Sequence, residues 1–357
     1  MPETMKTSPD YLRMSLAAAI TLGLRTGTFY RDARLHCLNL LLTYPDGCYA
    51  NCSYCGLRRA REDAGAQQQS FIRVEWPAYH IDEIIQRAGA SRDRLERVCV
   101  SMIMHPQAFD DTVHLIERLC RDVGLPVSVL ANPTSMAAGM MEDLKTAGAD
   151  MLSVAVDAVA PDLFDEHRGT GVEGPHKWDN YWESLSEAAL VFGRDKFGCH
   201  LIAGLGETEK QMVKAIHQVR VMGGRTHLFA FYPEAGSLLA AHAPCPASKF
   251  RRVQLARFLI DYHLVVADKM EFDEHGRLIG YGLIGGTIDE LVNSGKPFMT
   301  SGCPGSSKAC ACNRPFGDGP PSDIRSYPFE LAANDIRSVR KELATYQEIT
   351  AAVDLKV

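Results

Sequence analysis

The chain has 357 residues, with 38 Lys and Arg against 44 Asp and Glu and a formal net charge of −6. This length suffices for one large α/β domain with an appendage, or for two ordinary domains. No apolar stretch is long enough for a membrane span, residues 1–6 lack the apolar core of a secretory signal, and no Lys- or Arg-rich run points to nucleic acid. We therefore expect a cytoplasmic protein that binds neither membranes nor nucleic acid.

Strand-like and helix-like stretches alternate along most of the chain. Ser8 and Pro9 suit the start of a helix, which is predicted over residues 8–24. Apolar runs of strand length follow at residues 38–43, 97–103, 126–131, 151–156, 199–203 and 226–232, with weaker candidates at 278–282 and 297–300. Amphipathic helical patterns separate them, at residues 111–122, 136–146, 176–192, 207–222 and 249–267.

This alternation predicts parallel strands that are buried on both faces. Eight strand–helix units would close a TIM-type (β/α)₈ barrel. An open doubly wound sheet is the alternative, but no G-x-G-x-x-G loop follows the first strand. We expect an N-terminal helical segment (1–35), the barrel (36–302), and an irregular C-terminal segment (303–357) that is rich in Gly, Pro, Ser and Cys and closes with a helix over 332–346.

Six of the 11 cysteines fall into two tight clusters, one near each end of the chain. Cys48, Cys52 and Cys55 form a C-x₃-C-x₂-C motif directly after the first predicted strand. Three thiolates on one loop can hold three irons of a [4Fe–4S] cluster and leave the fourth iron open. Zinc is the alternative, but structural zinc takes four ligands. The motif therefore favours an iron–sulfur cluster.

With Tyr54 before its third cysteine, the motif resembles the signature of the radical S-adenosylmethionine (SAM) enzymes. The resemblance implies that the open iron binds the methionine part of SAM, whose reductive cleavage yields a 5′-deoxyadenosyl radical. Residues 198–208 resemble the fifth-strand segment of biotin synthase and its relatives. That match implies that Ile202, Gly204 and Gly206 adjoin the cofactor.

The same resemblance assigns roles to three further residues. Tyr54 would lie near the adenine, Asp157 would bind the ribose hydroxyls, and Arg168 would pair with the methionine carboxylate. Taken alone, Asp157 is more simply explained as a helix cap and Arg168 as a surface charge, and it is their register with the cysteine motif that favours the functional roles. One departure is that residues 101–104 read Ser-Met-Ile-Met where many members carry Gly-Gly-Glu, which leaves the partner of the methionine amine open.

Cys303, Cys310 and Cys312 form the second cluster and predict an auxiliary [4Fe–4S] cluster, with zinc as the alternative. Biotin synthase holds a sulfur-donating cluster on cysteines of its second, third and fifth strands. The matching positions here are Cys99, Ser128 and Gly198, so the C-terminal triplet would replace that set. We expect the triplet at the same barrel mouth as the first motif. Its fourth ligand stays open between Cys37, Cys99, Ser326 and none.

Residues 37–45 and 312–316, with this arrangement of cysteines, resemble the two-subunit, archaeal-type lipoyl synthases. The resemblance implies sulfur insertion into an octanoyl chain on a carrier protein or peptide. It also implies a sister radical SAM subunit and an electron donor such as ferredoxin or flavodoxin. Another biotin-synthase-like enzyme, either a sulfur inserter or a carbon-skeleton mutase acting on a free metabolite, is one alternative. A zinc-stabilised binding protein is the other.

Overall fold

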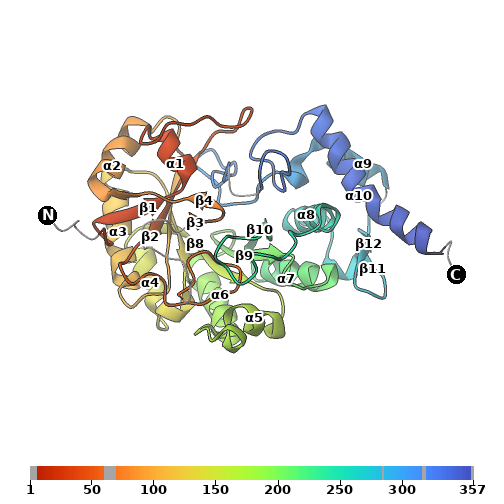
Figure 1. Cartoon of the computed structure of the whole chain (residues 1–357), viewed down its shortest axis with the longest axis horizontal. Coiled ribbons are helices and arrows are strands. Elements are labelled where there is room, and N and C mark those ends of the chain that lie inside the picture. The colour runs from red at the N-terminus through yellow and green to blue at the C-terminus, as the bar shows by residue number, and fades with distance from the viewer. Residues whose placement is uncertain (1–5, 60–69, 284, 316–318, 355–357) are drawn as a thin grey trace.

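Six parallel strands form the centre of the molecule in the computed structural model, which describes residues 6–59, 70–283, 285–315 and 319–354 (Figure 1). The strands are β2 (Cys37–Leu42), β6 (Arg97–Ser101), β7 (Val127–Ala131), β8 (Ala149–Asp157), β9 (Phe197–Ala203) and β10 (Arg225–Ala230). All six were predicted from their apolar runs, and most of their residues are buried on both faces of the sheet.

Helices connect these strands and cover the outer face of the sheet (Figure 1). They are α2 (Ile81–Ala90), α3 (Ala108–Asp122), α4 (Met140–Thr146), α5 (Pro161–Arg168), α6 (Trp178–Phe192) and α7 (Glu209–Val221). Each parallel strand pair therefore has the helical crossover that such a pair requires. Within the described part of the chain, no helix combines the length and apolarity that a bilayer span requires.

The expectation of a closed eight-stranded barrel is wrong for the described residues, because their sheet is open. Its strand order is β10-β9-β8-β7-β6-β2-β1-β5. The strand β1 (Tyr11–Met14) pairs antiparallel with both β2 and the edge strand β5 (Ala78–His80). After β10 the chain forms α8 (Ala247–Asp261), which is buried around its whole circumference from Phe250 onward. This helix agrees with the helix predicted over residues 249–267, and no further strand of the described residues joins the sheet beyond β10.

The two weaker strand candidates do not join this sheet. Residues 278–282 contribute β12 (Leu278–Gly280), which pairs with β11 (Glu271–Phe272) in a separate hairpin. Residues 297–300 fall in a 3₁₀ turn, Lys296–Phe298, and the two residues after it. The helix α9 (Gly285–Ser294) lies between β12 and this turn. After the turn, a segment whose described residues form no helix or strand leads to α10 (Ala333–Asp354), the predicted closing helix.

The helix predicted over residues 8–24 is wrong in its first half. Leu12 and Met14 are fully buried while their neighbours are partly exposed, so this stretch follows the two-residue period of a strand and forms β1. The helix α1 (Leu16–Thr21) begins later, with Ser15 as its N-cap. The hydroxyl of Ser8 instead accepts the backbone N–H of Thr43 at 3.0 Å, which ties the N-terminal segment to the end of β2.

A buried ion pair fixes α8 against α7 and β12. Arg252 and Glu209 are both at least nine-tenths buried, and the Glu209 carboxylate also accepts the backbone N–H of Leu278 at 2.7 Å. Replacing Glu209 by Ala leaves a buried guanidinium without its countercharge. We expect the free energy of unfolding to fall by about 3–5 kcal/mol.

Urea denaturation of the Glu209→Ala variant measures this loss. Asp289→Ala, which removes an exposed partner of Arg340, is the matched control and should cost roughly 1 kcal/mol or less. Equal losses in the two variants would contradict the role given to the buried pair.

Candidate functional site

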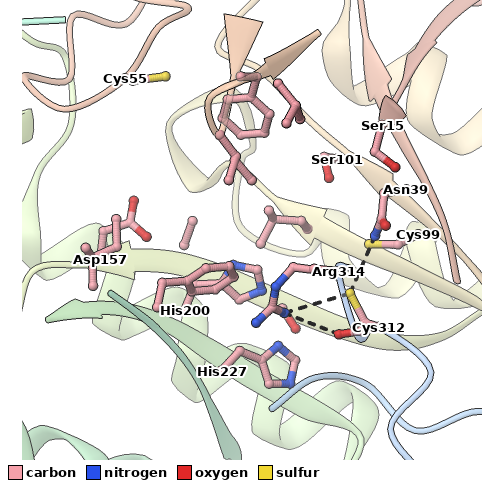
Figure 2. Close-up of a pocket in the computed structure, with 18 of the residues that line it drawn as sticks. Ser15, Asn39, Cys55, Cys99, Ser101, Asp157, His200, His227, Cys312 and Arg314 are labelled. Carbon is pink, nitrogen blue, oxygen red and sulfur yellow. Dashed lines mark hydrogen bonds between the residues drawn. The ribbon is translucent and has the colours of Figure 1, made fainter. Parts of the chain in front are cut away.

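The inward side of the six parallel strands encloses a cavity of about 220 Å³ (Figure 2). Because side chains alternate along a strand, alternate residues of the strands point into this space. A hairpin of β3 (Ser70–Phe71) and β4 (Val74–Glu75) adds an apolar wall. The polar side chains that line the cavity are Ser15, Asn39, Tyr54, Cys55, Arg73, Cys99, Ser101, Ser128, Ser153, Asp157, His200, His227, Tyr232, Glu234, Cys303, Cys312 and Arg314.

The first cysteine motif follows the C-terminal end of β2, as predicted. The backbone N–H of Tyr49 donates to Met104 O at 2.8 Å, and that of Ser53 donates to His167 O at 2.9 Å, so the loop is tied to two other segments. Cys48, Cys52 and Cys55 interact electrostatically with one another, and burial raises the pKa of each thiol. Cys55 lines the cavity. The loop therefore brings three thiols to one end of the cavity.

Asp157 and Arg168 lie beside this loop and contact each other. The Asp157 carboxylate is 3.4 Å from an Arg168 Nη1 and accepts the Tyr54 hydroxyl at 2.5 Å. Arg168 is 5% exposed, which excludes its being a surface charge. Its guanidinium donates to Val156 O at 3.0 Å and to the Tyr181 hydroxyl at 3.2 Å, whereas its buried Nε has no hydrogen-bond partner among the described residues.

The electrostatics of this group follow from its burial. Desolvation raises the pKa of Asp157 above its ordinary value, while the Arg168 charge and the Tyr54 hydroxyl oppose this rise. Asp157 is also the last residue of β8 and has a left-handed backbone, with φ of 65°. Asp tolerates this conformation better than most residues. The structure thus presents a carboxylate and a guanidinium at the end of the strand where the three thiols lie.

The residues of the fifth-strand segment divide between the cavity and the backbone turn after β9. Ile202 lines the cavity. Gly204 and Gly206 have φ of 107° and 105°, and a Cβ at Gly204 would come within 2.8 Å of the Cys245 Cβ. Only glycine meets both demands at position 204. These two glycines therefore have a conformational reason to be glycine, in addition to the cofactor contact that the resemblance implies.

The second cysteine set lies at the opposite end of the strands, so the prediction of a shared mouth is wrong. Cys303 comes shortly after the 3₁₀ turn Lys296–Phe298. The next residue, Pro304, contacts the start of β6, because its carbonyl oxygen accepts a hydrogen bond from the Arg97 Nε at 2.7 Å. Arg97 is the first residue of β6, and the parallel strands all begin at this end. Cys303 and Cys312 nevertheless line the same cavity as Cys55.

Two cysteines of the sheet join the C-terminal set. Cys37 is hydrogen-bonded to Cys312, and the Cys99 thiol interacts electrostatically with both Cys303 and Cys312. The Asn39 amide is 3.5 Å from the Cys312 sulfur and 3.8 Å from that of Cys37 (Figure 2). The bond from Cys37, then Arg314 and Asn39, lower the pKa of Cys312 to about 6. Burial raises that of Cys303 to about 11 and that of Cys310 to about 12.

Ser326, the remaining candidate for a fourth ligand, lies elsewhere. Its hydroxyl is 3.3 Å from the Gln254 amide of α8, and it lines a different pocket from the thiols. The structure therefore brings together five thiols, namely those of Cys37, Cys99, Cys303, Cys310 and Cys312, and leaves Ser326 out of the group. Cys99 points into the interior of the sheet as predicted.

Among the described residues, no three Cys, His, Asp or Glu side chains are arranged closely enough to hold a single metal ion. In a [4Fe–4S] cluster each thiolate binds a different iron, so the ligand sulfurs lie farther apart than those around a single metal ion. The donor chemistry of both sets, three or more thiols in a buried space, suits such a cluster.

Sequence reasoning missed the polar groups in the middle of the cavity. The rings of His200 and His227 have centroids 5.1 Å apart, and burial lowers the pKa of both, that of His227 to about 3, so both are neutral at pH 7. The Arg314 guanidinium carbon lies 4.1 Å from the centroid of the Phe229 ring, and its Nη1 is 4.0 Å from the Cys312 sulfur. No motif marks these residues, although the strand alternation places His200 on the same face as Ile202.

Comparisons with known proteins identify the family to which the first part of the chain is similar. Residues 42–219 match the family model described as the radical SAM superfamily. A biotin synthase of Nocardioides sp. (strain ATCC BAA-499 / JS614) is 26% identical over 190 residues, which cover 52% of this chain and 46% of that protein. The chain therefore matches less than half the length of this curated relative.

Two solved structures align with part of this chain at low TM-scores. One is the radical S-adenosylmethionine methyltransferase TsrM from Kitasatospora setae, with cobalamin and a [4Fe–4S] cluster bound. The alignment covers 73% of this chain and 52% of the TsrM chain, with 13% identity and a TM-score of 0.39. SuiB from Streptococcus suis, bound to S-adenosylmethionine, covers 64% and 48%, with 16% identity and a TM-score of 0.44. At these TM-scores the likeness carries no argument about the reaction.

The contact between Cys37 and Cys312 gives a test of the thiol geometry. In cluster-free protein, mild oxidation should join these two cysteines, because a disulfide forms only between thiols that already lie close together. Peptide mapping by mass spectrometry should find the Cys37–Cys312 cross-link and no bond from Cys37 to Cys55. The Cys37→Ser variant is the control, since it should lack the cross-link. Cross-links confined to the C-terminal segment would contradict the described arrangement.

Proposed function

We propose that this chain, which belongs to the radical SAM superfamily, inserts sulfur into a saturated carbon chain, as a subunit of the lipoyl synthase type. One observation carries the proposal: thiol sets at both ends of the strands face a single cavity. Breaking an unpolarised C–H bond requires a radical, and the carbon radical then needs a sulfur atom within bonding reach. A cavity between two thiol-bound clusters supports both requirements.

The residues at the Cys48 end fit a SAM-binding [4Fe–4S] cluster. Cys48, Cys52 and Cys55 would hold three of its irons. When bound, the cluster and SAM supply an electron and a carbon radical precursor. The chain's own residues bind and orient the cofactor: the unpartnered Arg168 Nε suits a carboxylate, and the Asp157 carboxylate suits a ribose diol. Tyr54 positions Asp157 through the hydroxyl bond.

The residues at the opposite end fit an auxiliary [4Fe–4S] cluster. Cys303, Cys310 and Cys312 come from one segment, and Cys99 offers a fourth thiol from the sheet, facing Cys303 and Cys312. Cys37 contacts Cys312 directly, which is closer than two ligands on different irons lie. We therefore favour Cys99 over Cys37 as the fourth ligand. In this position the cluster would adjoin the inner cavity, which Cys99, Cys303 and Cys312 line.

The cavity walls support an apolar substrate. Phe71, Ile72, Val74, Trp76 and Phe229 contribute hydrocarbon or aromatic surface between the two thiol sets. An octanoyl chain on a carrier protein or peptide suits such a space better than a charged metabolite does. A sister radical SAM subunit and a ferredoxin- or flavodoxin-type electron donor belong to the same proposal, and a cytoplasmic location would supply both.

Iron content distinguishes sulfur insertion from a mutase reaction that needs one cluster. After anaerobic reconstitution we expect about eight irons per chain, and about four in either triple Cys→Ala variant, at positions 48, 52 and 55 or at 303, 310 and 312. Iron and sulfide analysis, with Mössbauer spectra, measures this. Bound zinc in a colourless protein would support the binding-protein alternative. About four irons in the unaltered chain would contradict the auxiliary cluster.

The two cysteine sets should contribute to different steps of the reaction, so their variants should lose different activities. With SAM, reductant and an octanoylated carrier peptide, the Cys303→Ala, Cys310→Ala, Cys312→Ala variant should still form 5′-deoxyadenosine but add no sulfur to the peptide. The variant at positions 48, 52 and 55 should lose both, because the Cys48 end would hold the cofactor. Liquid chromatography and peptide mass measure the two products. A mass gain that survives loss of the C-terminal thiols would overturn their role as donor site.

A further inference from the structure

A second cavity, of about 430 Å³, lies next to the C-terminal thiols and is distinct from the inner one. The two cavities share no lining residue. Cys310 lines this outer pocket, whereas Cys303 and Cys312 line the inner cavity. An isolated bridge pairs Pro304 with Cys310 in this segment, and the Cys310 thiol interacts electrostatically with those of Cys303 and Cys312, so the residue borders the outer pocket while its thiol belongs to the C-terminal set.

The outer pocket has polar walls with an excess of acidic groups. Asp32, Glu96 and Glu330 contribute carboxylates, against Arg34 and the imidazole of His36. Glu96 is already bonded to the backbone N–H of Ser307 at 3.0 Å, while Asp32 and Glu330 are exposed. Carboxylates at a pocket entrance raise the local concentration of cations.

One wall of the pocket also holds an unused polar atom. Thr300 lines the pocket and is 6% exposed, and its hydroxyl has no hydrogen-bond partner among the described residues. Its backbone N–H is occupied by Tyr327 O at 2.9 Å. Buried hydroxyls are usually satisfied by protein or water, so this one is consistent with a pocket that admits water or a hydrated ion.

We propose that the outer pocket is the route by which ferrous iron reaches the C-terminal thiols, separately from the substrate. The inference rests on the proposed function, because a cluster that gives up sulfur must be rebuilt while the inner cavity holds cofactor and product. Iron enters as Fe²⁺, and each thiol that binds it releases one proton. Closing a [4Fe–4S]²⁺ cluster from four Fe²⁺ and four sulfide ions also releases two electrons, which a ferric salt in solution accepts as the one-electron oxidant. Sulfide is supplied from solution in the same way.

The test uses the full chain with Cys48, Cys52 and Cys55 replaced by Ala, so that all bound iron belongs to the C-terminal site. Cluster-free protein receives Fe²⁺, sulfide and a fixed amount of ferric salt as oxidant anaerobically, and the growth of cluster absorbance gives a rate. Ala309 is exposed beside Cys310 and lines the pocket. The Ala309→Trp variant should load iron several-fold more slowly than its control, Ala309→Ser, and reach the same final iron content.

A second variant tests the charge without filling the pocket. Asp32→Asn with Glu330→Gln should slow loading by roughly tenfold at low salt and much less at high salt, as expected for steering of a cation. Both sites are exposed, so the fold should be kept. Equal loading rates in all variants would overturn the route but leave the proposed function standing. Failure of the background protein to bind about four irons would overturn both.

Discussion

The position of the C-terminal thiols depends on one buried arginine at the start of β6. Arg97 is 2% exposed, and its guanidinium forms two bonds to the Asp150 carboxylate, at 2.5 and 2.8 Å, and one to Pro304 O. A buried guanidinium is stable only when its hydrogen-bond and charge partners are present. Because Pro304 O is one of these partners, the bond holds the segment after Cys303 at the start of β6. Glu96 adds a bond to Ser307 from the adjacent position. The thiol set therefore lies where β6 begins, although its cysteines come from residues more than 200 positions later.

Space for that segment comes from small side chains on the strands. Asn39, Cys99 and Ser128 are neighbours across β2, β6 and β7, and Ser153 faces Gly198 across β8 and β9. A Cβ at Gly198 would lie 3.2 Å from both the His227 Nε2 and the Ser153 Oγ, so a larger residue there would fill the floor of the cavity. The positions that match the cluster ligands of biotin synthase are thus mostly small here. They leave room for the thiols of the C-terminal segment, which lie at the end where the parallel strands begin.

The parts of the structure that depend on local periodicity were predictable from the sequence. Six apolar runs became six parallel strands, and the Cys48 motif follows the first of them because a strand end and a loop are local features. The open sheet was not predictable, since residues 278–282 have strand composition, and their sequence does not reveal that they pair with β11 in a separate hairpin instead of extending the sheet at β10. Burial of Arg168 was likewise invisible, because its partners Val156 and Tyr181 are 12 and 13 residues away.

The error about the C-terminal triplet is the informative one. Placing it after an eighth strand put it at the mouth with Cys55, but without a seventh and an eighth strand the chain returns to the start of the sheet instead. That return changes what the cavity can do. Two clusters at one mouth would compete for the entrance, whereas clusters at opposite ends leave the middle of the cavity, near His200 and Phe229, for the substrate. A chain lying there would meet a radical from one side and sulfur from the other.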